Sequence, residues 1–290
     1  MIECIGLASG EGAGNRDCSE GPLFLKNNLN IKCLNWRKIV TPQNKTQDKY
    51  DLLANLNEEL AKESFELSKK GSFFFSFGGD HSSAIGTWSG VAAEKKEKNQ
   101  EIGLIWIDAH MDSHIPSTSP SGNIHGMPLA ALLGYGDSRL THVLSKSAKI
   151  KPENLVLIGI RSFEKEEEIF LKKLNVKIYY IEEVLRKGFK NILEETIADL
   201  AKKTACYGVS FDLDVIDPKH VNAVGTPVPN GIKAEDAIEA MDVLKKHFPI
   251  AFEIVEYNPK LDEDKKTLKF TEKLIQKLIN GECKNDSSNN

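Results

Sequence analysis

Long hydrophobic segments and a strong excess of charge are both missing from this 290-residue chain. No apolar run approaches the ~20 residues that a membrane-spanning helix needs. The formal net charge is only −4, and a weakly acidic chain is a poor candidate for general binding to nucleic acid or to a membrane surface. We therefore expect no nucleic-acid partner and no membrane partner, and a small molecule as the ligand.

Cysteine is scarce, and its positions are scattered. The chain has 5 cysteines, at Cys4, Cys18, Cys33, Cys206 and Cys283. No pair has C-x-x-C spacing, which excludes a zinc ribbon and a thioredoxin-like site. Near the N-terminus, Glu3 stands where a secretion signal would carry lysines, and the apolar stretch breaks at residues 9–12. The sequence therefore predicts a reduced, cytoplasmic protein.

Apolar residues are abundant enough for a real core, since they make up 40% of the chain against 28% charged residues. Wholesale disorder is therefore excluded. At roughly 150 residues per domain the length suggests two domains, although α/β folds often exceed that size as one unit. No Pro/Ser-rich linker divides the chain, and we find no internal repeat.

Short apolar runs alternate with longer amphipathic segments. The runs predict strands at residues 2–7, 32–36, 72–77, 102–107, 155–160, 176–181, 208–211 and 251–255. Apolar residues at helical spacing predict a helix from about residue 51 to 69, and others around 193–201, 237–248 and 274–278. This alternation predicts an α/β fold, with a parallel sheet covered by helices on both faces.

Acidic residues or histidines follow four of the predicted strands. In open α/β sheets, ligands bind beyond the carboxyl ends of the strands, so these positions are candidate site residues. The segments are Gly78-Gly79-Asp80-His81-Ser82, Asp108-Ala109-His110-Met111-Asp112, Asp212-Leu213-Asp214 and Glu256-Tyr257-Asn258-Pro259. This is the strongest functional signal in the chain.

The Asp108-x-His110-x-Asp112 segment has the spacing of a metal site. Residues i, i+2 and i+4 of an extended segment point the same way, so three ligating side chains would converge. Asp212 and Asp214 repeat the arrangement from another strand. The six candidate ligands are His81, Asp108, His110, Asp112, Asp212 and Asp214. Their carboxylates would repel one another without a cation. Four aspartates and two histidines without cysteine favour Mn²⁺ over structural Zn²⁺, and six ligands favour two ions over one.

Each motif alone has a simpler explanation. An Asp-x-His-x-Asp segment can be a solvated loop, and Gly78-Gly79-Asp80-His81 can be a turn with a capping aspartate. Gly10-x-Gly12-x-Gly14 lacks the spacing of a dinucleotide-binding loop. A two-metal phosphoesterase would need basic phosphate-binding residues beside the metals, and the motifs supply none.

Further motifs make the chain resemble the arginase (ureohydrolase) family. Beside the two motifs around His81 and Asp108, they are Ser121-Gly122-Asn123-Ile124-His125-Gly126-Met127-Pro128, Ser210-Phe211-Asp212-Leu213-Asp214 and Gly225-Thr226-Pro227. The resemblance implies a three-layer α/β/α fold with a central, mostly parallel eight-stranded sheet of the arginase/deacetylase type. It implies one ureohydrolase catalytic domain over residues 1–282, since the ligand motifs span both halves of the chain. We expect a disordered tail over residues 283–290.

The resemblance also implies two Mn²⁺ ions and their ligands. One ion would be held by His81, Asp108, Asp112 and Asp212, and the other by Asp108, His110, Asp212 and Asp214. Asp108 and Asp212 would bridge the ions. A bridging water, present as hydroxide near neutral pH, would attack the guanidinium carbon of the substrate and yield urea and an amine. Co²⁺, Ni²⁺ or Fe²⁺ could occupy the same ligands.

Three further residues match the family's catalytic and binding positions. His125 resembles the proton shuttle to the leaving amine, although a histidine outside this motif would be an ordinary surface residue. Glu256 resembles the carboxylate that pairs with the guanidinium and orients it. Thr226 matches a position that supports the same end of the substrate. With Asp108, His125 and Glu256 are the expected catalytic residues.

Four further residues are expected near the far end of the substrate. Ser121 and Asn123 belong to the arginase form of their loop and suit a carboxylate, directly or through water. Glu164 is either the family's acid near the α-amino group or a helix-start acid. His114 departs from the asparagine that arginases usually have there, and we expect it to contact the far end of the substrate.

The first expectation is therefore an arginase, which hydrolyses L-arginine to L-ornithine and urea. Agmatinase, guanidinobutyrase and formimidoylglutamase activities remain open on the same site. A non-catalytic regulatory member of the fold is a remote alternative, because such proteins typically lose metal ligands and all six are present here. The resemblance suggests a homo-oligomer, either a trimer or a hexamer.

Overall fold

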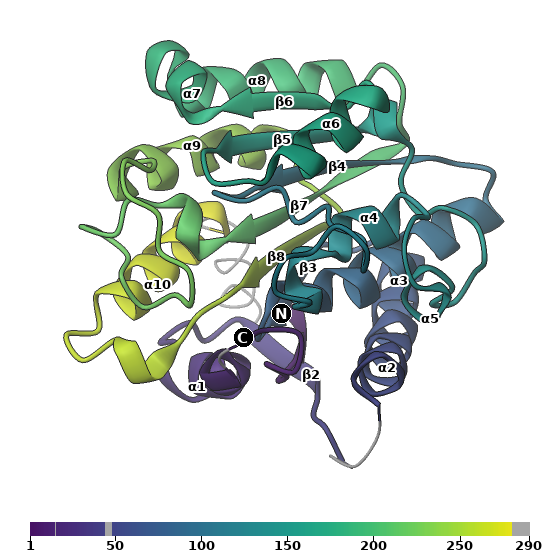
Figure 1. The fold of residues 1–290 in the computed structure, drawn as a ribbon. Coiled ribbons are helices and arrows are strands. Elements are labelled where there is room, and N and C mark those ends of the chain that lie inside the picture. Colours follow the sequence, from purple (N-terminus) through teal and green to yellow (C-terminus); the bar gives the residue numbers. More distant parts are fainter. Residues whose placement is uncertain (15, 44–47, 280–290) are drawn as a thin grey trace.

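Eight strands form one sheet in the order β2-β1-β3-β8-β7-β4-β5-β6, and all their pairings are parallel (Figure 1). The computed structural model describes residues 1–14, 16–43 and 48–279. The strands are β1 (Ile2–Leu7), β2 (Leu34–Val40), β3 (Phe74–Gly78), β4 (Ile102–Ile107), β5 (Leu155–Ile160), β6 (Lys177–Tyr180), β7 (Cys206–Asp212) and β8 (Ala251–Val255). Every predicted strand is present.

The largest difference in bounds is at β2, which was predicted at residues 32–36 and runs from Leu34 to Val40. This strand lies at the edge of the sheet and carries Arg37 and Lys38 in its middle. Because an edge strand keeps one side near water, it tolerates polar residues that break an apolar run. The apolar run alone therefore misplaces this strand.

Helices cover both faces of the sheet, which confirms the predicted three-layer fold (Figure 1). One face packs against α1 (Gly21–Asn28), α7 (Ile181–Lys187), α8 (Phe189–Leu200), α9 (Ala234–Lys246) and α10 (Lys266–Ile279). The other face packs against α2 (Lys49–Lys70), α3 (Ala84–Glu97), α4 (Pro128–Leu132), α5 (Ser138–Thr141) and α6 (Lys165–Lys173). Successive strand residues alternate between the faces: Ile105 belongs to the first core, and Leu104 and Trp106 belong to the second.

The long helix α2 shows how local sequence sets these elements. Its apolar residues at helical spacing, among them Leu53 and Leu60, are fully buried against the sheet. Asp48 caps its start by accepting the backbone N–H groups of Tyr50 and Asp51. Gly71 ends it with a positive φ of 71°, a conformation that glycine adopts without strain.

The order of the sheet positions the candidate site. The four strands that carry the acidic and histidine motifs, β3, β8, β7 and β4, are consecutive neighbours at the centre of the sheet. Because all strands are parallel, their carboxyl ends meet at one edge. Residues separated by up to 175 positions, such as His81 and Glu256, therefore come into contact there.

Three expectations about the rest of the chain have different outcomes. The boundary expected at residue 282 and the tail over 283–290 lie outside the described residues. Within those residues, no helix is both long and apolar enough to cross a membrane. Cys4, Cys18 and Cys206 are not disulfide-bonded, whereas Cys33 is, so the expectation of a fully reduced chain is wrong for Cys33.

Candidate metal centre and active site

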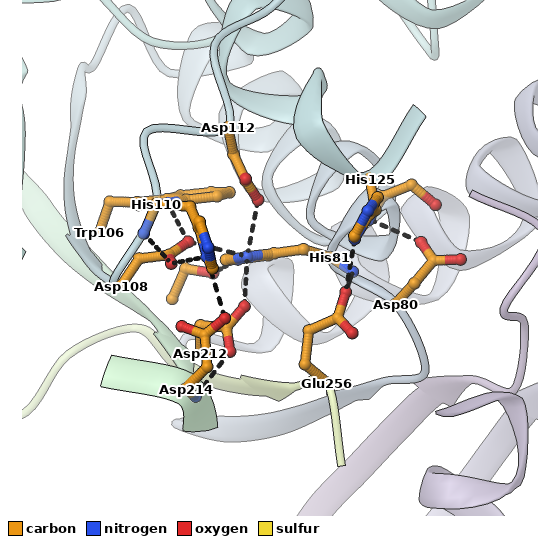
Figure 2. Close-up of polar contacts among 12 residues, drawn as sticks. Asp80, His81, Trp106, Asp108, His110, Asp112, His125, Asp212, Asp214 and Glu256 are labelled. Atoms are coloured by element: carbon orange, nitrogen blue, oxygen red, sulfur yellow. Dashed lines mark hydrogen bonds and ion pairs between the residues drawn. The ribbon is translucent and has the colours of Figure 1, made fainter. Parts of the chain in front are cut away.

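Two clusters of potential metal ligands lie side by side at the carboxyl edge of the sheet (Figure 2). One consists of His81, Asp108 and Asp212, and the other of Asp108, His110 and Asp214; within each, the ligand atoms lie within 4.8 Å of one another. Asp108 belongs to both. The structure thus brings together the predicted ligands, and their binding of metal remains a prediction.

His81 provides the test of whether a cation fits. Its Nδ1 atom lies 3.2 Å from Asp108 Oδ2, 3.1 Å from Asp112 Oδ2 and 3.1 Å from Asp212 Oδ2. The ring is fully buried, yet Nδ1 has no hydrogen-bond partner among the described residues. A buried polar atom without a partner is costly, and three carboxylate oxygens around one nitrogen match the donor set of a divalent cation. The residues therefore fit a metal ion.

The second cluster is more open. His110 Nδ1 lies 3.0 Å from Asp214 Oδ2 and 3.6 Å from Asp108 Oδ1. A backbone group also donates to one of these carboxylates: Asp108 Oδ1 accepts the N–H of His110 at 2.7 Å. The side chain of His110 reaches the pocket, whereas that of His81 is enclosed.

The electrostatics of the centre favour a cation. Burial, and then the neighbouring charges of Asp214 and Asp108, raise the pKa of Asp212 well above its usual value. Burial and the charge of Asp108 raise the pKa of Asp112 to about 6. Burial opposes protonation of His81, but the surrounding carboxylates outweigh it and raise the pKa of this histidine. Each shift has the same origin, which is negative charge crowded in a water-poor site.

The glycine-rich loop near the N-terminus supports this centre rather than a nucleotide. Asp80 accepts the backbone N–H groups of Gly12 at 2.7 Å and Ser82 at 2.8 Å. The carbonyl oxygen of Gly12 in turn accepts the N–H of His125 at 3.1 Å. A Cβ atom at Gly12 would lie 2.6 Å from Asp80 Oδ1, so the close approach requires glycine. The loop therefore links the His81 segment to the His125 segment.

Trp106 orients the centre, and the sequence interpretation missed it. Its indole N–H donates to Asp108 Oδ2 at 2.9 Å, and its ring stacks on His81 with centroids 4.0 Å apart and planes 8° apart. Trp106 lies in an apolar strand and looks like an ordinary core residue. The available signal was its spacing, two residues before a ligand on the same side of the strand.

His125 and Glu256 form the second part of the site (Figure 2). Nδ1 of His125 lies 3.1 Å from Glu256 Oε1, which also accepts the backbone N–H of His81 at 2.9 Å. Burial lowers the pKa of His125, but the contact with Glu256 outweighs it and raises this pKa to about 9. Glu256 is held at a φ of 65° and Asp112 at 45°, a left-handed conformation that non-glycine residues rarely adopt outside functional sites.

A pocket of about 170 Å³ opens above both parts of the site. All the predicted site residues line it except His81 and Asp108, which are buried beneath it. Thr226 contributes its hydroxyl, which donates to Asp214 Oδ2 at 3.2 Å. Four other lining residues were not predicted: Ser119, Pro120, Gly126 and Glu167.

The outer end of the pocket is polar. Nε2 of His114 lies 2.9 Å from Glu164 Oε2 and 3.4 Å from Glu167 Oε2. Glu164 is also the N-cap residue of α6, and its backbone N–H donates to Glu167. The helix-start interpretation of Glu164 is therefore correct, and its side chain faces the pocket as well. Ser121 and Asn123 lie on the loop at the rim, where Ser121 Oγ accepts the N–H of Asn123 at 3.2 Å.

The fold and the site together give a three-layer α/β/α protein with clustered metal-ligating side chains beneath a pocket. Comparison with known proteins agrees. The family model described as "Arginase family" matches residues 4–280. The arginase of Bacillus caldovelox is 44% identical over 228 residues, which cover 78% of this chain and 75% of that protein. The arginase of Bacillus subtilis is 42% identical, with 77% and 74% covered. The chain therefore belongs to the arginase family.

Solved structures show the same relationship. A crystal structure of Bacillus subtilis arginase superposes with a TM-score of 0.88 at 34% identity, covering 96% of this chain and 98% of that one. Entamoeba histolytica arginase in complex with L-ornithine gives a TM-score of 0.87 at 32% identity, with the same coverage. Bacillus subtilis formimidoylglutamase shares the fold, with a TM-score of 0.80 at 21% identity, 98% of this chain and 88% of that one.

Proposed function

We propose that this protein is a binuclear manganese hydrolase that converts L-arginine and water to L-ornithine and urea. The observation that supports it most directly is the pair of ligand clusters sharing Asp108, placed beneath a pocket that also contains His125 and Glu256. The relatives described as arginases support the same substrate.

The proposed ligands divide between the two ions as their contacts suggest. His81, Asp108, Asp112 and Asp212 would hold one ion, and Asp108, His110, Asp212 and Asp214 the other. Nitrogen and carboxylate donors without thiolate favour Mn²⁺ over structural Zn²⁺. When bound, the ions supply Lewis acidity, which lowers the pKa of a water molecule toward neutrality and so provides the nucleophile.

The remaining steps belong to side chains of this chain. Glu256 is buried and lines the pocket, so its carboxylate can accept hydrogen bonds from a guanidinium group and orient it over the clusters. His125 has a raised pKa and carries a proton near neutral pH. It can donate that proton to the departing amine, as a general acid must. The hydroxyl of Thr226 donates a hydrogen bond to Asp214 and so helps to orient this carboxylate.

The outer end of the pocket suits an amino-acid head group. Ser121 and Asn123 offer hydroxyl and amide donors to an α-carboxylate, and Glu164 offers an acceptor to an α-ammonium group. His114, which also lines the pocket and contacts Glu164, would contact the same end of the substrate. The Entamoeba relative in complex with L-ornithine supports a product of this size and charge.

A substrate panel tests the proposal. After loading with Mn²⁺, the protein should release urea from L-arginine faster than from agmatine or guanidinobutyrate. Faster release from agmatine or guanidinobutyrate would replace arginase by one of those activities. Formamide from formimidoylglutamate would identify a formimidoylglutamase. A protein that binds Mn²⁺ and turns over none of these would be a non-catalytic member of the family.

We also propose, from the family resemblance, that the protein is a cytoplasmic homo-oligomer, either a trimer or a hexamer. Cys4 and Cys206, which are not disulfide-bonded, support a reducing compartment, whereas the disulfide at Cys33 opposes it. Light scattering of the purified protein measures the assembly, and cell fractionation measures the location. A monomer, or a protein found outside the cytoplasm, would contradict the respective proposal.

A further inference from the structure

Glu253 is a fully buried carboxylate in the middle of the central strand β8, among apolar neighbours. Three side chains donate hydrogen bonds to its carboxylate. The hydroxyl of Thr87 donates to Oε1 at 2.7 Å, and the indole N–H of Trp88 and the hydroxyl of Ser210 donate to Oε2 at 2.9 and 2.7 Å. A buried carboxylate needs such donors, but burying one at all is costly compared with an apolar residue. A functional role would explain why a carboxylate is buried at this position.

Ser210 connects Glu253 to the metal centre. It lies on β7 directly opposite Glu253 in the strand register. Its Oγ atom is 2.9 Å from Nε2 of His81, whose other ring nitrogen faces the three aspartates. Glu253, Ser210 and His81 therefore form a continuous row of hydrogen bonds, all of it buried.

The direction of each hydrogen bond in this row follows from chemistry. An ionised carboxylate only accepts, so the single hydroxyl proton of Ser210 must point to Glu253. Ser210 Oγ can then only accept a hydrogen bond from His81, which makes Nε2 the protonated nitrogen. Nδ1 is left to face Asp108, Asp112 and Asp212, as a metal ligand must.

We propose that Glu253 is a positioning residue that acts through Ser210 to fix the tautomer and orientation of His81 for metal binding. Thr87 and Trp88, both on α3, hold the carboxylate in place from the other side. Mutation of a residue that hydrogen-bonds a metal ligand in this way typically lowers metal affinity 10- to 100-fold. The inference rests on the proposed metal binding but not on the identity of the substrate.

The row of hydrogen bonds through Glu253, Ser210 and His81 reaches only one of the two ligand clusters. A substitution in the row should therefore change Mn²⁺ affinity at that cluster alone. His81 belongs to the cluster with Asp212, whereas His110 and Asp214 have no contact with Ser210 or Glu253 among the described residues. Ser210→Ala removes the acceptor for His81 Nε2. It should weaken one Mn²⁺ site by about 10- to 100-fold and leave the other near its wild-type affinity.

Two substitutions at Glu253 separate the acceptor from the charge. Glu253→Met removes the acceptor and frees the hydroxyl of Ser210 to donate to Nε2, so it should weaken the same site as Ser210→Ala. Glu253→Gln can keep its oxygen toward Ser210 and turn its NH₂ toward Thr87, whose hydroxyl has Ser76 Oγ as another partner at 2.8 Å. The glutamine variant should therefore recover most of the lost affinity.

The experiment is a Mn²⁺ titration of the metal-free full chain, with free Mn²⁺ followed by electron paramagnetic resonance. Ser64→Ala is the matched control, because this buried hydroxyl donates to the backbone oxygen of Thr87 at 2.6 Å and lies outside the row. Thermal unfolding checks that each variant is folded. If Glu253→Met does not fold, Ser210→Ala still tests the loss of the hydrogen bond to His81.

The expected result is the same weakened site in Ser210→Ala and Glu253→Met, substantial recovery of its affinity in Glu253→Gln, and two wild-type sites in Ser64→Ala. Equal affinities in all folded variants, or equal weakening of both sites, would overturn the positioning role. A wild-type protein that binds Mn²⁺ but hydrolyses no guanidino compound would overturn the proposed function and leave this result readable. A wild type that binds no Mn²⁺ would overturn both.

Discussion

Nε2 of His114 lies 2.9 Å from a carboxylate oxygen of Glu164 at the outer end of the pocket. The histidine side chain is only 7% exposed, whereas that of Glu164 is 51% exposed. The buried partner is therefore fixed, and its second ring nitrogen is already engaged by the hydroxyl of Thr118 at 3.1 Å. Where arginases usually carry an asparagine, this chain has a histidine that holds an acidic side chain in the pocket wall.

The first prediction concerns this contact. His114→Asn shortens the side chain and removes the contact with Glu164. We therefore expect kcat/KM for L-arginine to fall by about tenfold, which corresponds to the loss of roughly one hydrogen bond to a charged group. Agmatine lacks the α-carboxylate and should change less. The matched control is His220→Asn, a histidine outside the pocket lining. Unchanged kcat/KM for every guanidino compound would show that His114 does not contact the substrate.

The second prediction concerns pH and metal binding. In the metal-free protein, burial and Asp108 raise the pKa of Asp112 to about 6, and the carboxylates raise that of His81 despite its burial. Both groups therefore hold protons that a metal ion must displace. Mn²⁺ affinity should therefore rise with pH, through about 6 because of Asp112 and further above 6.5 because of His81, by about tenfold per pH unit for each proton displaced. Calorimetry in buffers of different ionisation enthalpy measures the proton release; an affinity independent of pH between 5.5 and 7.5 would contradict the assignment.

The third prediction separates chemistry from binding. His125→Asn removes the proposed proton donor but leaves both ligand clusters intact, so kcat should fall by about 10²- to 10⁴-fold while Mn²⁺ stoichiometry stays the same. Steady-state urea release and a metal titration give the two readouts. If kcat stays within a fewfold of the wild type, the amine receives its proton from another group.

The candidate metal ligands could be located in the sequence because each group of them follows an apolar strand. A buried parallel strand is recognisable as a short apolar run, and its carboxyl end is where ligands bind. His81, Asp108 and Asp212 stand at such ends. The order of the strands was not visible in the sequence, because β8 inserts between β3 and β7 from the far end of the chain. Pairing between distant strands depends on tertiary packing, and only the structure shows that the four motif-bearing strands are adjacent.

The supporting residues were missed for a different reason. Trp106 and Ser210 belong to strands that read as ordinary core, and their hydrogen bonds depend on which residues the neighbouring strands place opposite them. Glu253 was the detectable exception. A glutamate inside the apolar run Ala-Phe-Glu-Ile-Val must either face water or meet buried donors, and in a central strand the second outcome is the expected one.

The last prediction concerns Arg161, whose hydrogen bonds join Asp214 and Val215 to residues 228–229. All five N–H donors of its guanidinium point to backbone carbonyl oxygens, the shortest bonds being 2.7 Å to Asp214 and 2.8 Å to Val228. Arg161→Met would remove all five donors, and of these carbonyl oxygens that of Val215 would still accept the N–H of Ile232. We expect the free energy of unfolding to fall by about 2–3 kcal/mol, as for the loss of a charged hydrogen-bonding group in a partly buried site.

Arg139 is the matched control for Arg161, because it also binds several oxygens but lies at the surface. Its guanidinium contacts the carboxylates of Asp137, Asp48 and Asp51, and solvent screens those exposed pairs. Arg139→Met should therefore shift the urea midpoint far less than Arg161→Met does. Since Arg161 also donates to the backbone carbonyl oxygen of Asp214, a proposed ligand, its variant should lose Mn²⁺ affinity at the His110 cluster, and the Arg139 variant should not. Equal destabilisation by the two substitutions would mean that the backbone contacts of Arg161 contribute no more than surface ion pairs.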